Sequence, residues 1–305
     1  MRISAFMPVT NSVKRGDTFI EAIKTHLYWA DELVVVDGGS TDGTIEKIKE
    51  IGDPRIKIET LYWPQEHWSW IEFPNHWNFG LSKCTGDWVA AGESDHIFHE
   101  NEAKRLRNEL MVRMDERIAV CPLDKLQSLR FDQWFSKSKI YYFINKKLYP
   151  EICYGFDPHY LTDLCQPIKP DGGNVYGLPR GEAIIEGGKH SNMVHGLGPT
   201  LYNYLWTFKT IEMVIRERTL SSEAWNLFKG FSEVHRTHLP KGAEDIEKSV
   251  LGQLRGIRTK IVKNIPLELH PKIMQEKIKN ELVPGMIGYG LEEAESYYFK
   301  NKRSS

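Results

Sequence analysis

The stretch VVVDGGSTDGT, residues 34–44, joins an apolar run to a glycine turn and then to the start of a helix. Residues 33–36 are all apolar, as expected of a parallel strand that is buried on both faces. After Asp37, Gly38 and Gly39 let the backbone approach a ligand closely, and the Ser and Thr residues that follow can cap a helix over residues 41–49. The stretch therefore predicts a strand–turn–helix unit with a carboxylate at the strand end. A dinucleotide-binding loop is a poor fit, because no G-x-G-x-x-G occurs here.

Strand and helix patterns alternate on both sides of this unit. The patterns predict strands at residues 3–9, 55–59 and 88–91, and helices at residues 17–30, 74–84 and 100–116. Such alternation folds with right-handed crossovers into an α/β domain, a doubly wound and mostly parallel sheet flanked by helices. Ligands of these sheets bind beyond the carboxyl ends of the strands. The acids that follow two of the strands, Asp37 and the pair Glu93/Asp95, are therefore expected at one site.

The second of these strand ends lies in WVAAGESDHIFHE, residues 88–100. An apolar strand breaks at Gly92 and delivers Glu93 and Asp95, one residue apart. Burying such charges is costly unless a cation sits opposite them, and hard carboxylate oxygens suit Mg²⁺ or Mn²⁺. The alternative is a polar strand end that reaches solvent. His96 and His99 are expected to form local hydrogen bonds.

Composition bounds the class of protein. The chain has 305 residues, 41% hydrophobic and 27% charged, with a net charge of −1, which is typical of a globular protein and gives no electrostatic footprint for nucleic acid. The N-terminus is a strand pattern rather than a signal peptide, and no apolar run approaches about 18 residues. The four Cys lack C-x-x-C pairs, which favours reduced thiols over a disulfide framework or a zinc knuckle. These features predict a cytoplasmic or membrane-peripheral protein without a transmembrane segment.

The C-terminal third has a different pattern. Helical periodicity with basic faces recurs over residues 201–218 and 244–279. We therefore predict an α/β domain over residues 1–200 and a helical extension over residues 201–305.

Three ordered blocks carry a resemblance to a known family: MPVTNS (residues 7–12), VVVDGGSTDGT, and FPNHWNFGLSKCTGDWVAAGESDHI (residues 73–97). In the third block, NFGL followed by TGDW looks like the run N-x-G-L-x-x-A-x-G-D-W that precedes a D-x-D motif. Together the blocks resemble family 2 glycosyltransferases, inverting enzymes of the GT-A fold. The resemblance covers about the first 200 residues.

The resemblance implies a nucleotide-sugar site. The positions that it carries over are Pro8, Thr10, Asn11, Asp37, Gly38, Asn78, Glu93, Ser94 and Asp95. Asp37 matches the acid that reads the nucleobase, while Gly38 stands where the family often has a second Asp. Trp77 occupies the position where the family commonly has an Arg or Lys that binds phosphate. Another basic residue would then have to bind the phosphate.

The same resemblance implies a divalent cation, Mn²⁺ or Mg²⁺. Glu93-Ser94-Asp95 falls where the family has D-x-D, with Glu in place of the first Asp. Asp95 matches the carboxylate that usually holds the cation, and Glu93 can meet the ribose or a metal-bound water. His195 resembles a late His that completes metal coordination or contacts phosphate, and His190 is a weaker candidate.

An inverting transfer also needs a carboxylate that takes the proton of the acceptor hydroxyl. Glu182 is the first candidate, because R-G-E followed by an apolar pair and a later His-Gly resembles the family's H-E…H-x-G ending. Asp171 and Asp163 are the reserves. The predicted reaction moves a sugar from a nucleotide-diphosphate donor to a hydroxyl of a glycan, a lipid-linked acceptor or a polymer.

Two alternatives remain open from the residues. The first is transfer to hydroxylated DNA bases, which needs a basic and aromatic acceptor groove. The basic clusters Lys137/Lys139, Lys146/Lys147 and Arg255/Arg258/Lys260/Lys263 are interpreted either as solvated faces or as a track for an anionic acceptor such as a lipopolysaccharide core, a teichoic-type polymer or nucleic acid. The second is a non-catalytic protein that binds a nucleotide sugar or a glycan. The aromatic segment over residues 62–77 is read either as a stacking surface, with Trp68 and Trp70 exposed, or as core.

Overall fold

The computed structural model describes residues 1–63, 72–113, 120–150, 153–154, 161–162, 197–198, 200–227, 243–258 and 260–303. The first half of the chain contains β1 (Ile3–Val9), α1 (Ser12–Arg15), α2 (Phe19–His26), β2 (Glu32–Asp37), α3 (Thr44–Lys49), β3 (Ile56–Thr60), α4 (Glu72–Lys83), β4 (Trp88–Ala91), β5 (His96–Ile97), α5 (Glu100–Val112), β6 (Val120–Arg130) and β7 (Gln133–Asn145). The second half contains β8 (Cys153–Tyr154), β9 (Leu161–Thr162), β10 (Thr200–Asn203), α6 (Ile211–Leu227), α8 (Ala243–Arg258), β11 (Ile261–Asn264), a 3-10 turn (Leu267–Leu269), α9 (Lys272–Glu281) and α10 (Leu291–Lys302).

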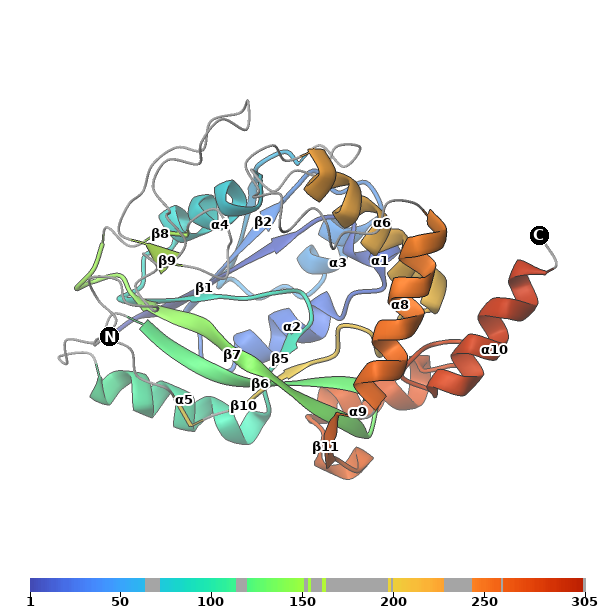
Figure 1. Cartoon of the computed structure of the whole chain (residues 1–305). Coiled ribbons are helices and arrows are strands. Elements are labelled where there is room, and N and C mark those ends of the chain that lie inside the picture. The colour runs from blue at the N-terminus through green and yellow to red at the C-terminus, as the bar shows by residue number, and fades with distance from the viewer. Residues whose placement is uncertain are drawn as a thin grey trace.

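One large sheet organises the molecule, with strand order β3-β2-β1-β4-β7-β6-β10-β5 and β11 paired to β7 (Figure 1). The strands β3, β2, β1 and β4 run parallel to one another. Beyond β4 the sheet is mixed, since β7 runs antiparallel to β4 and to β6, and β10 runs parallel to β6. The α/β class with flanking helices is confirmed.

The three inner parallel strands, β1, β2 and β4, are buried on both faces, which explains why their sequences are mostly apolar. On one face, Phe6 of β1 and Val34 of β2 pack against α4 through Trp77 and Leu81. The alternate residues of the same strands belong to a second cluster with α2 and α5; this cluster includes Ala5, Met7, Leu33, Val35, Ile23, Leu106 and Leu110. Successive side chains of a strand point to opposite faces, so each strand contributes to two cores.

Two segments that the periodicity assigned to helices are partly strands. Residues 200–203 form β10, which lies between β6 and β5, and α6 begins only at Ile211. Residues 261–264 form β11 between α8 and α9. The prediction of continuous helices over residues 201–218 and 244–279 was wrong at these points, because pairing with β6 and β7 outweighs the local helical pattern.

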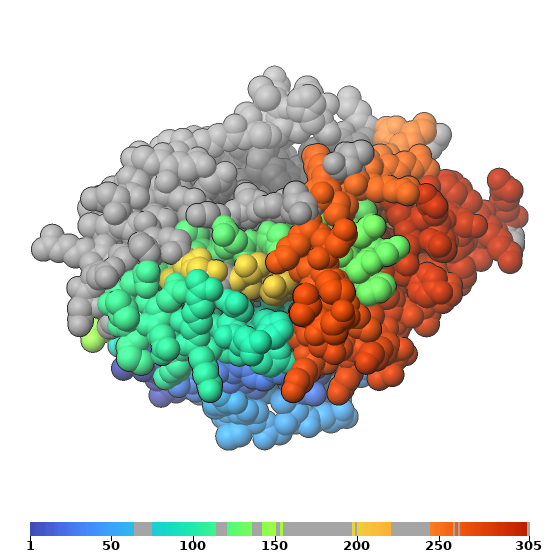
Figure 2. All heavy atoms as spheres, turned by 90° about the horizontal axis from the view of Figure 1, so that it is seen from below, coloured from blue at the N-terminus to red at the C-terminus, as the bar shows by residue number. Residues whose placement is uncertain are grey.

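The C-terminal helices complete a third apolar cluster. Ile211 and Val214 of α6 pack with Ile246, Val250 and Leu254 of α8 in a cluster that also includes Leu129 of β6. At the start of α9 the Lys272 amide donates to Glu100 of α5 over 2.8 Å, and Figure 2 shows C-terminal residues packed directly beside α5. The extension is therefore mostly helical, and it packs on the sheet that it extends. Across the described part of the chain, none of the helices is long and apolar enough to cross a membrane.

The cysteines depart from the expectation of four reduced thiols. Cys153 of β8 is disulfide-bonded, and its partner lies outside the described residues. Cys84 and Cys121 are buried thiols, and burial raises the pKa of Cys84 to about 12. Pairing of cysteines depends on which segments approach one another in the folded chain, which spacing along the sequence does not show.

A buried histidine under the sheet makes stability depend on pH. His26 is fully buried; its Nδ1 lies 2.7 Å from the Ala22 carbonyl and its Nε2 lies 2.6 Å from the Tyr142 hydroxyl. Burial lowers the pKa of His26 to about 4. Between about pH 6.5 and pH 4, His26 is therefore mostly protonated in the unfolded chain and mostly neutral in the folded chain. We expect this group to lower the free energy of unfolding by about 2 kcal/mol between pH 7.5 and pH 5. Urea denaturation of the wild type and of H26Q checks this: the pH-dependent loss should be smaller in H26Q, and an equal loss would contradict it.

Candidate active site

The parallel strands deliver their following loops to one place, as expected. The loop after β1 is clasped to the loop after β2, because the Asn11 amide donates to Ser40 Oγ over 2.9 Å and the Thr41 amide donates to Asn11 Oδ1 over 2.8 Å. Asn11 takes a left-handed conformation, with φ of 47°. The loop after β4 joins them through the Gly92 amide, which donates to the Phe6 carbonyl over 2.8 Å. The carboxyl ends of β1, β2 and β4 therefore meet at one edge.

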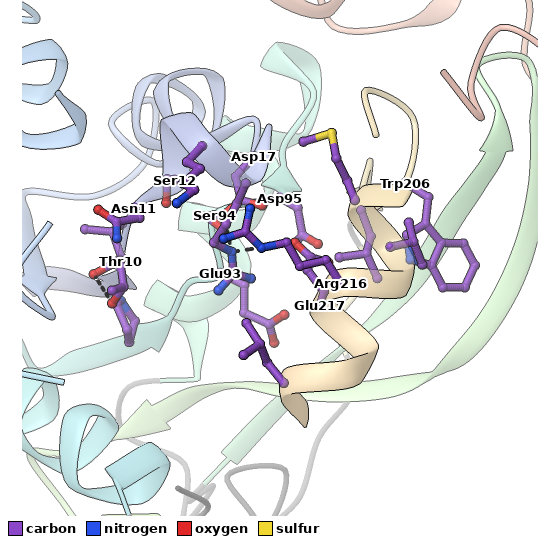
Figure 3. A pocket seen from close by; sticks show the side chains of 18 of the residues that line it. Thr10, Asn11, Ser12, Asp17, Glu93, Ser94, Asp95, Trp206, Arg216 and Glu217 are labelled. Atoms are coloured by element: carbon purple, nitrogen blue, oxygen red, sulfur yellow. Dashed lines mark hydrogen bonds and ion pairs between the residues drawn. The ribbon is translucent and has the colours of Figure 1, made fainter. Parts of the chain in front are cut away.

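A cavity of about 410 Å³ opens beside this edge (Figure 3). Its N-terminal lining comes from the end of β1, from α1 and the residues on either side of it, from the chain after β3, from α4 and from the turn after β4. These residues are Pro8, Val9, Thr10, Asn11, Ser12, Lys14, Arg15, Asp17, Trp63, Trp77, Gly92, Glu93, Ser94 and Asp95. The opposite wall comes from residues 205–220, with Leu205, Trp206, Met213, Val214, Arg216, Glu217, Arg218 and Leu220. Six of the positions carried over from the resemblance, Pro8, Thr10, Asn11, Glu93, Ser94 and Asp95, thus line one cavity.

Asp95 is the most unusual group in this lining. Its side chain is buried, and its Oδ1 accepts no hydrogen bond from the described residues. Burial, reinforced by the nearby carboxylate of Glu93, raises the pKa of Asp95 to about 7. The nearby cations Lys125 and Lys209 lower this pKa less than burial and Glu93 raise it, so an ionised Asp95 is only partly compensated by the protein.

The surroundings of Asp95 fit a divalent cation. Glu93, Asp95 and His96 each offer one ligand atom, and these atoms lie within 4.8 Å of one another. His96 Nε2 lies 3.5 Å from Glu93 Oε2 and 3.8 Å from Asp95 Oδ1. Two carboxylates suit Mg²⁺ or Mn²⁺, and an imidazole is a common additional ligand of transition metals. His96 had been expected to form only local hydrogen bonds. For His99 that expectation is confirmed, since its Nδ1 accepts from the Asn101 amide and caps α5.

A buried ion cluster joins the two walls of the cavity. Lys209, only 1% exposed, lies 2.9 Å from Asp17 Oδ1 and 2.6 Å from Glu217 Oε1 of α6. Arg15 lies 3.2 Å from Asp17 Oδ2, and Ser94 Oγ donates to the same oxygen over 3.1 Å. Burial by itself would raise the pKa of Asp17, but Arg15 and Lys209 hold it below its usual value. Asp17 thus connects the turn that carries Asp95 to α6, a connection that sequence reasoning missed.

Three of the positions carried over lie outside the cavity lining. Asp37 is buried and accepts from the Ser40 amide over 3.0 Å. The amide of Asn78 pairs with the backbone of Tyr154, donating to its carbonyl over 2.8 Å and accepting from its N–H over 2.7 Å. Gly38 packs directly against Thr10 and Trp63. The binding roles of these residues stay predictions.

The described aromatic residues of the 62–77 segment divide between core and surface. Trp77 is buried, with its ring 5.7 Å from Phe6 and 5.0 Å from Tyr154. Trp63 is buried against His76, whereas Tyr62 is exposed. Trp68 and Trp70 lie outside the described residues. Trp63 and Trp77 are therefore mostly buried, and both also line the cavity, so a stacking role of their rings stays a prediction.

Gly38 leaves no room for the second Asp that the family often has there. A Cβ at this position would lie 2.2 Å from Thr10 Oγ1 and 2.9 Å from Trp63 Cβ. We expect G38A to lower the free energy of unfolding by about 1–3 kcal/mol, as overpacking does. Chemical denaturation measures this, with G252A as the control, since nothing lies within 4 Å of a Cβ at Gly252 in α8 and Ala favours the helix. A G38A protein as stable as the wild type would contradict the close packing.

The predicted general bases and the late histidines lie outside the described residues. These are Glu182, with its reserves Asp171 and Asp163, and His195 with His190. Their roles stay predictions.

Several of the basic residues considered for an anionic acceptor are used within the fold. Lys146 Nζ donates to the carbonyls of Leu81 and Cys84. Arg255 pairs with Glu295 over 2.9 Å, and Arg258 pairs with Glu292 over 2.8 Å. These three side chains therefore do not supply a free basic track for nucleic acid.

A search of curated proteins finds no match. Among solved structures, TarS 1–349 from S. aureus is 14% identical, with 88% of this chain and 82% of that chain covered and a TM-score of 0.45. The mannosyltransferase PcManGT from Pyrobaculum calidifontis, in complex with GDP-Man and Mn²⁺, is 13% identical, with 84% and 75% covered and a TM-score of 0.42. Glucosyl-3-phosphoglycerate synthase from Mycobacterium tuberculosis, in complex with phosphoglyceric acid, is 20% identical over 42% of this chain and 44% of that one, with a TM-score of 0.30.

The decisive match is to a family. The model of glycosyl transferase family 2 matches residues 4–162, just over half of the 305 residues. This match spans β1 to β9 and includes the turn that carries Glu93 and Asp95. It confirms the resemblance and the GT-A-like assignment of the α/β sheet. The chain belongs to glycosyl transferase family 2 and is a glycosyltransferase that uses a nucleotide sugar.

Proposed function

We propose that this glycosyltransferase is metal-dependent and inverting, and that it transfers a sugar from a nucleotide-diphosphate donor to an acceptor hydroxyl. The observation that carries the metal dependence is Asp95, a buried carboxylate with an oxygen that no described residue contacts by a hydrogen bond. It stands at the carboxyl end of β4 beside the cavity, next to Glu93 and His96. A cation in this position would stabilise the ionised carboxylate, which burial otherwise disfavours.

The residues divide the work as follows. Asp95 and Glu93 would hold Mn²⁺ or Mg²⁺, with the His96 imidazole within reach. When bound, such a cation neutralises charge on the diphosphate and on the departing nucleotide. Pro8, Thr10 and Asn11 would contact the nucleotide at the end of β1, and Asp37 would read its base.

The proton of the acceptor hydroxyl must leave as that oxygen attacks the anomeric carbon. Glu182 is our first candidate for the carboxylate that takes it, and Asp171 and Asp163 are the reserves. His195 would contact phosphate or complete the metal coordination. A single attack on the face opposite the leaving nucleotide inverts the configuration at the anomeric carbon.

A donor screen tests this proposal. The protein is incubated with UDP-, GDP-, CMP- and dTDP-sugars, with Mn²⁺ or with EDTA, and release of the free nucleotide is followed. We expect release from a nucleoside-diphosphate sugar, in Mn²⁺ only, and NMR of the product should show an inverted anomeric configuration. Release that is equal in EDTA would overturn the metal dependence, and a retained configuration would overturn the inverting mechanism.

A further inference from the structure

We propose that Arg216 of α6, in the C-terminal part of the chain, binds the donor diphosphate. It would take the place of the Arg or Lys that the resemblance expects at position 77. This inference rests on the proposed function, since it names a further residue of the same donor site. The family match ends at residue 162, so it assigns nothing to α6.

Position 77 cannot provide the base. Trp77 is an apolar ring, buried between Phe6 and Tyr154 on the face of the sheet that α4 covers. A diphosphate needs hydrogen-bond donors and positive charge. A basic side chain that binds the diphosphate must therefore come from another position in the lining.

The cavity lining contains as many acidic as basic side chains among the described residues. Among the described residues, four cations line it, Lys14, Arg15, Arg216 and Arg218, and four carboxylates line it, Asp17, Glu93, Asp95 and Glu217. The lining is therefore neutral by itself. Lys209 lies outside the lining but pairs with Asp17 and Glu217, so a divalent cation on Asp95 and Glu93 would make the site net positive, as the two negative charges of a nucleoside-diphosphate sugar require.

The four lining cations are not equally available. Arg15 lies within 3.7 Å of both Asp17 and Glu217, and these acids, Asp17 first, raise its pKa. Lys14, Arg216 and Arg218 are exposed, and within the described ranges no carboxylate lies within ion-pair distance of any of them. Arg15 thus serves the ion cluster, and the other three remain for a ligand.

Of these three, we assign the role to Arg216, which lines the cavity from α6. Its neighbour Glu217 is bound by the buried Lys209, whose other partner is Asp17. Asp17 in turn receives Ser94 Oγ, the residue between Glu93 and Asp95. The same cluster therefore fixes α6 and the metal-binding turn relative to one another, and Figure 3 shows Arg216 and Glu217 on the helix that faces Glu93 and Asp95. A guanidinium binds phosphate oxygens in a bidentate manner.

Binding of nucleotides to R216A, R216K and the wild type tests the inference. UDP and GDP, and the corresponding UMP and GMP, are titrated in Mn²⁺ by calorimetry, and binding of Mn²⁺ alone is measured by electron paramagnetic resonance. We expect R216A to weaken binding of the preferred nucleoside diphosphate at least about tenfold, since bonds to charged groups are the strong ones. The monophosphate should lose less, R216K should recover part of the loss, and Mn²⁺ affinity should stay unchanged.

The control is R258A, which removes an exposed arginine of α8 that pairs with Glu292 and lies outside the cavity lining. It should bind the diphosphate as the wild type does, and thermal unfolding should show that R216A is folded. R216A binding the diphosphate within twofold of the wild type, or losing mono- and diphosphate equally, would overturn the role of Arg216 while leaving the proposed function standing. A wild type that binds no nucleoside diphosphate in Mn²⁺ would overturn both.

Discussion

Replacing Asp95 by asparagine should reduce sugar transfer at least about a thousandfold, since a catalytic cation contributes several kcal/mol to the transition state. Asn keeps the size of the side chain and removes the charge that would hold the cation. The fold should survive, because the buried Oδ1 of Asp95 has no hydrogen-bond donor to lose. Removing the charge of a carboxylate whose ionised form burial disfavours should leave the free energy of unfolding unchanged or higher.

Initial rates of nucleotide release and chemical denaturation measure the two halves of this prediction. E292Q is the matched control, because Glu292 is a largely exposed acid of α10, 75% exposed, outside the cavity lining. It should keep wild-type transfer. D95N transfer near the wild-type rate would show that the cation is not held at Asp95, and a large loss of stability would show that Asp95 has a structural partner.

Replacing Lys209 by methionine should lower the free energy of unfolding by about 3–5 kcal/mol, the usual result when one partner of a buried ion pair is removed. Lys209 is 1% exposed and bridges Asp17 and Glu217. Its loss leaves Asp17, which is also buried, with Arg15 as its remaining cation. Because Asp17 also accepts from Ser94, donor binding should weaken together with stability.

Denaturant titration of K209M and K302M tests this. Lys302 pairs with Glu247 over 2.5 Å but is 54% exposed, and exposed pairs contribute about 0–1 kcal/mol, so K302M should lose little. The double variant K209M/E217Q, which also neutralises one of the two acids, should recover part of the loss. Equal stabilities of K209M and K302M would refute the structural role of the cluster.

The sequence predicted most of the N-terminal half because each local pattern there agrees with its tertiary setting. The all-apolar run over residues 33–36 became β2 in the middle of the parallel strands. The acids after β4 lie at the carboxyl end of that strand and line a cavity, as sheets of this class require. Asn11, Thr10 and Pro8 lie beside them.

What the sequence left out depends on contacts between segments that are distant along the chain. Lys209 and Asp17 lie 192 positions apart in number, so no local pattern joins them. In the sequence, Arg216 is one of several basic residues in a helical pattern. Only the folded chain, in which α6 lines the cavity, places Arg216 at the site. His96 follows Asp95 directly, and the turn after Gly92 decides that both can face one cation. The disulfide of Cys153 also depends on how segments of the folded chain approach one another.

Donor binding should depend on a divalent cation that the acidic turn after β4 holds. Calorimetric titration of the wild type and of D95N with UDP and GDP, in Mn²⁺ and in EDTA, tests it most directly. The wild type should bind one of these nucleotides at least about tenfold more tightly in Mn²⁺ than in EDTA, and D95N should show no such difference. Equal affinity of the wild type in Mn²⁺ and in EDTA, or a full Mn²⁺ effect in D95N, would contradict it.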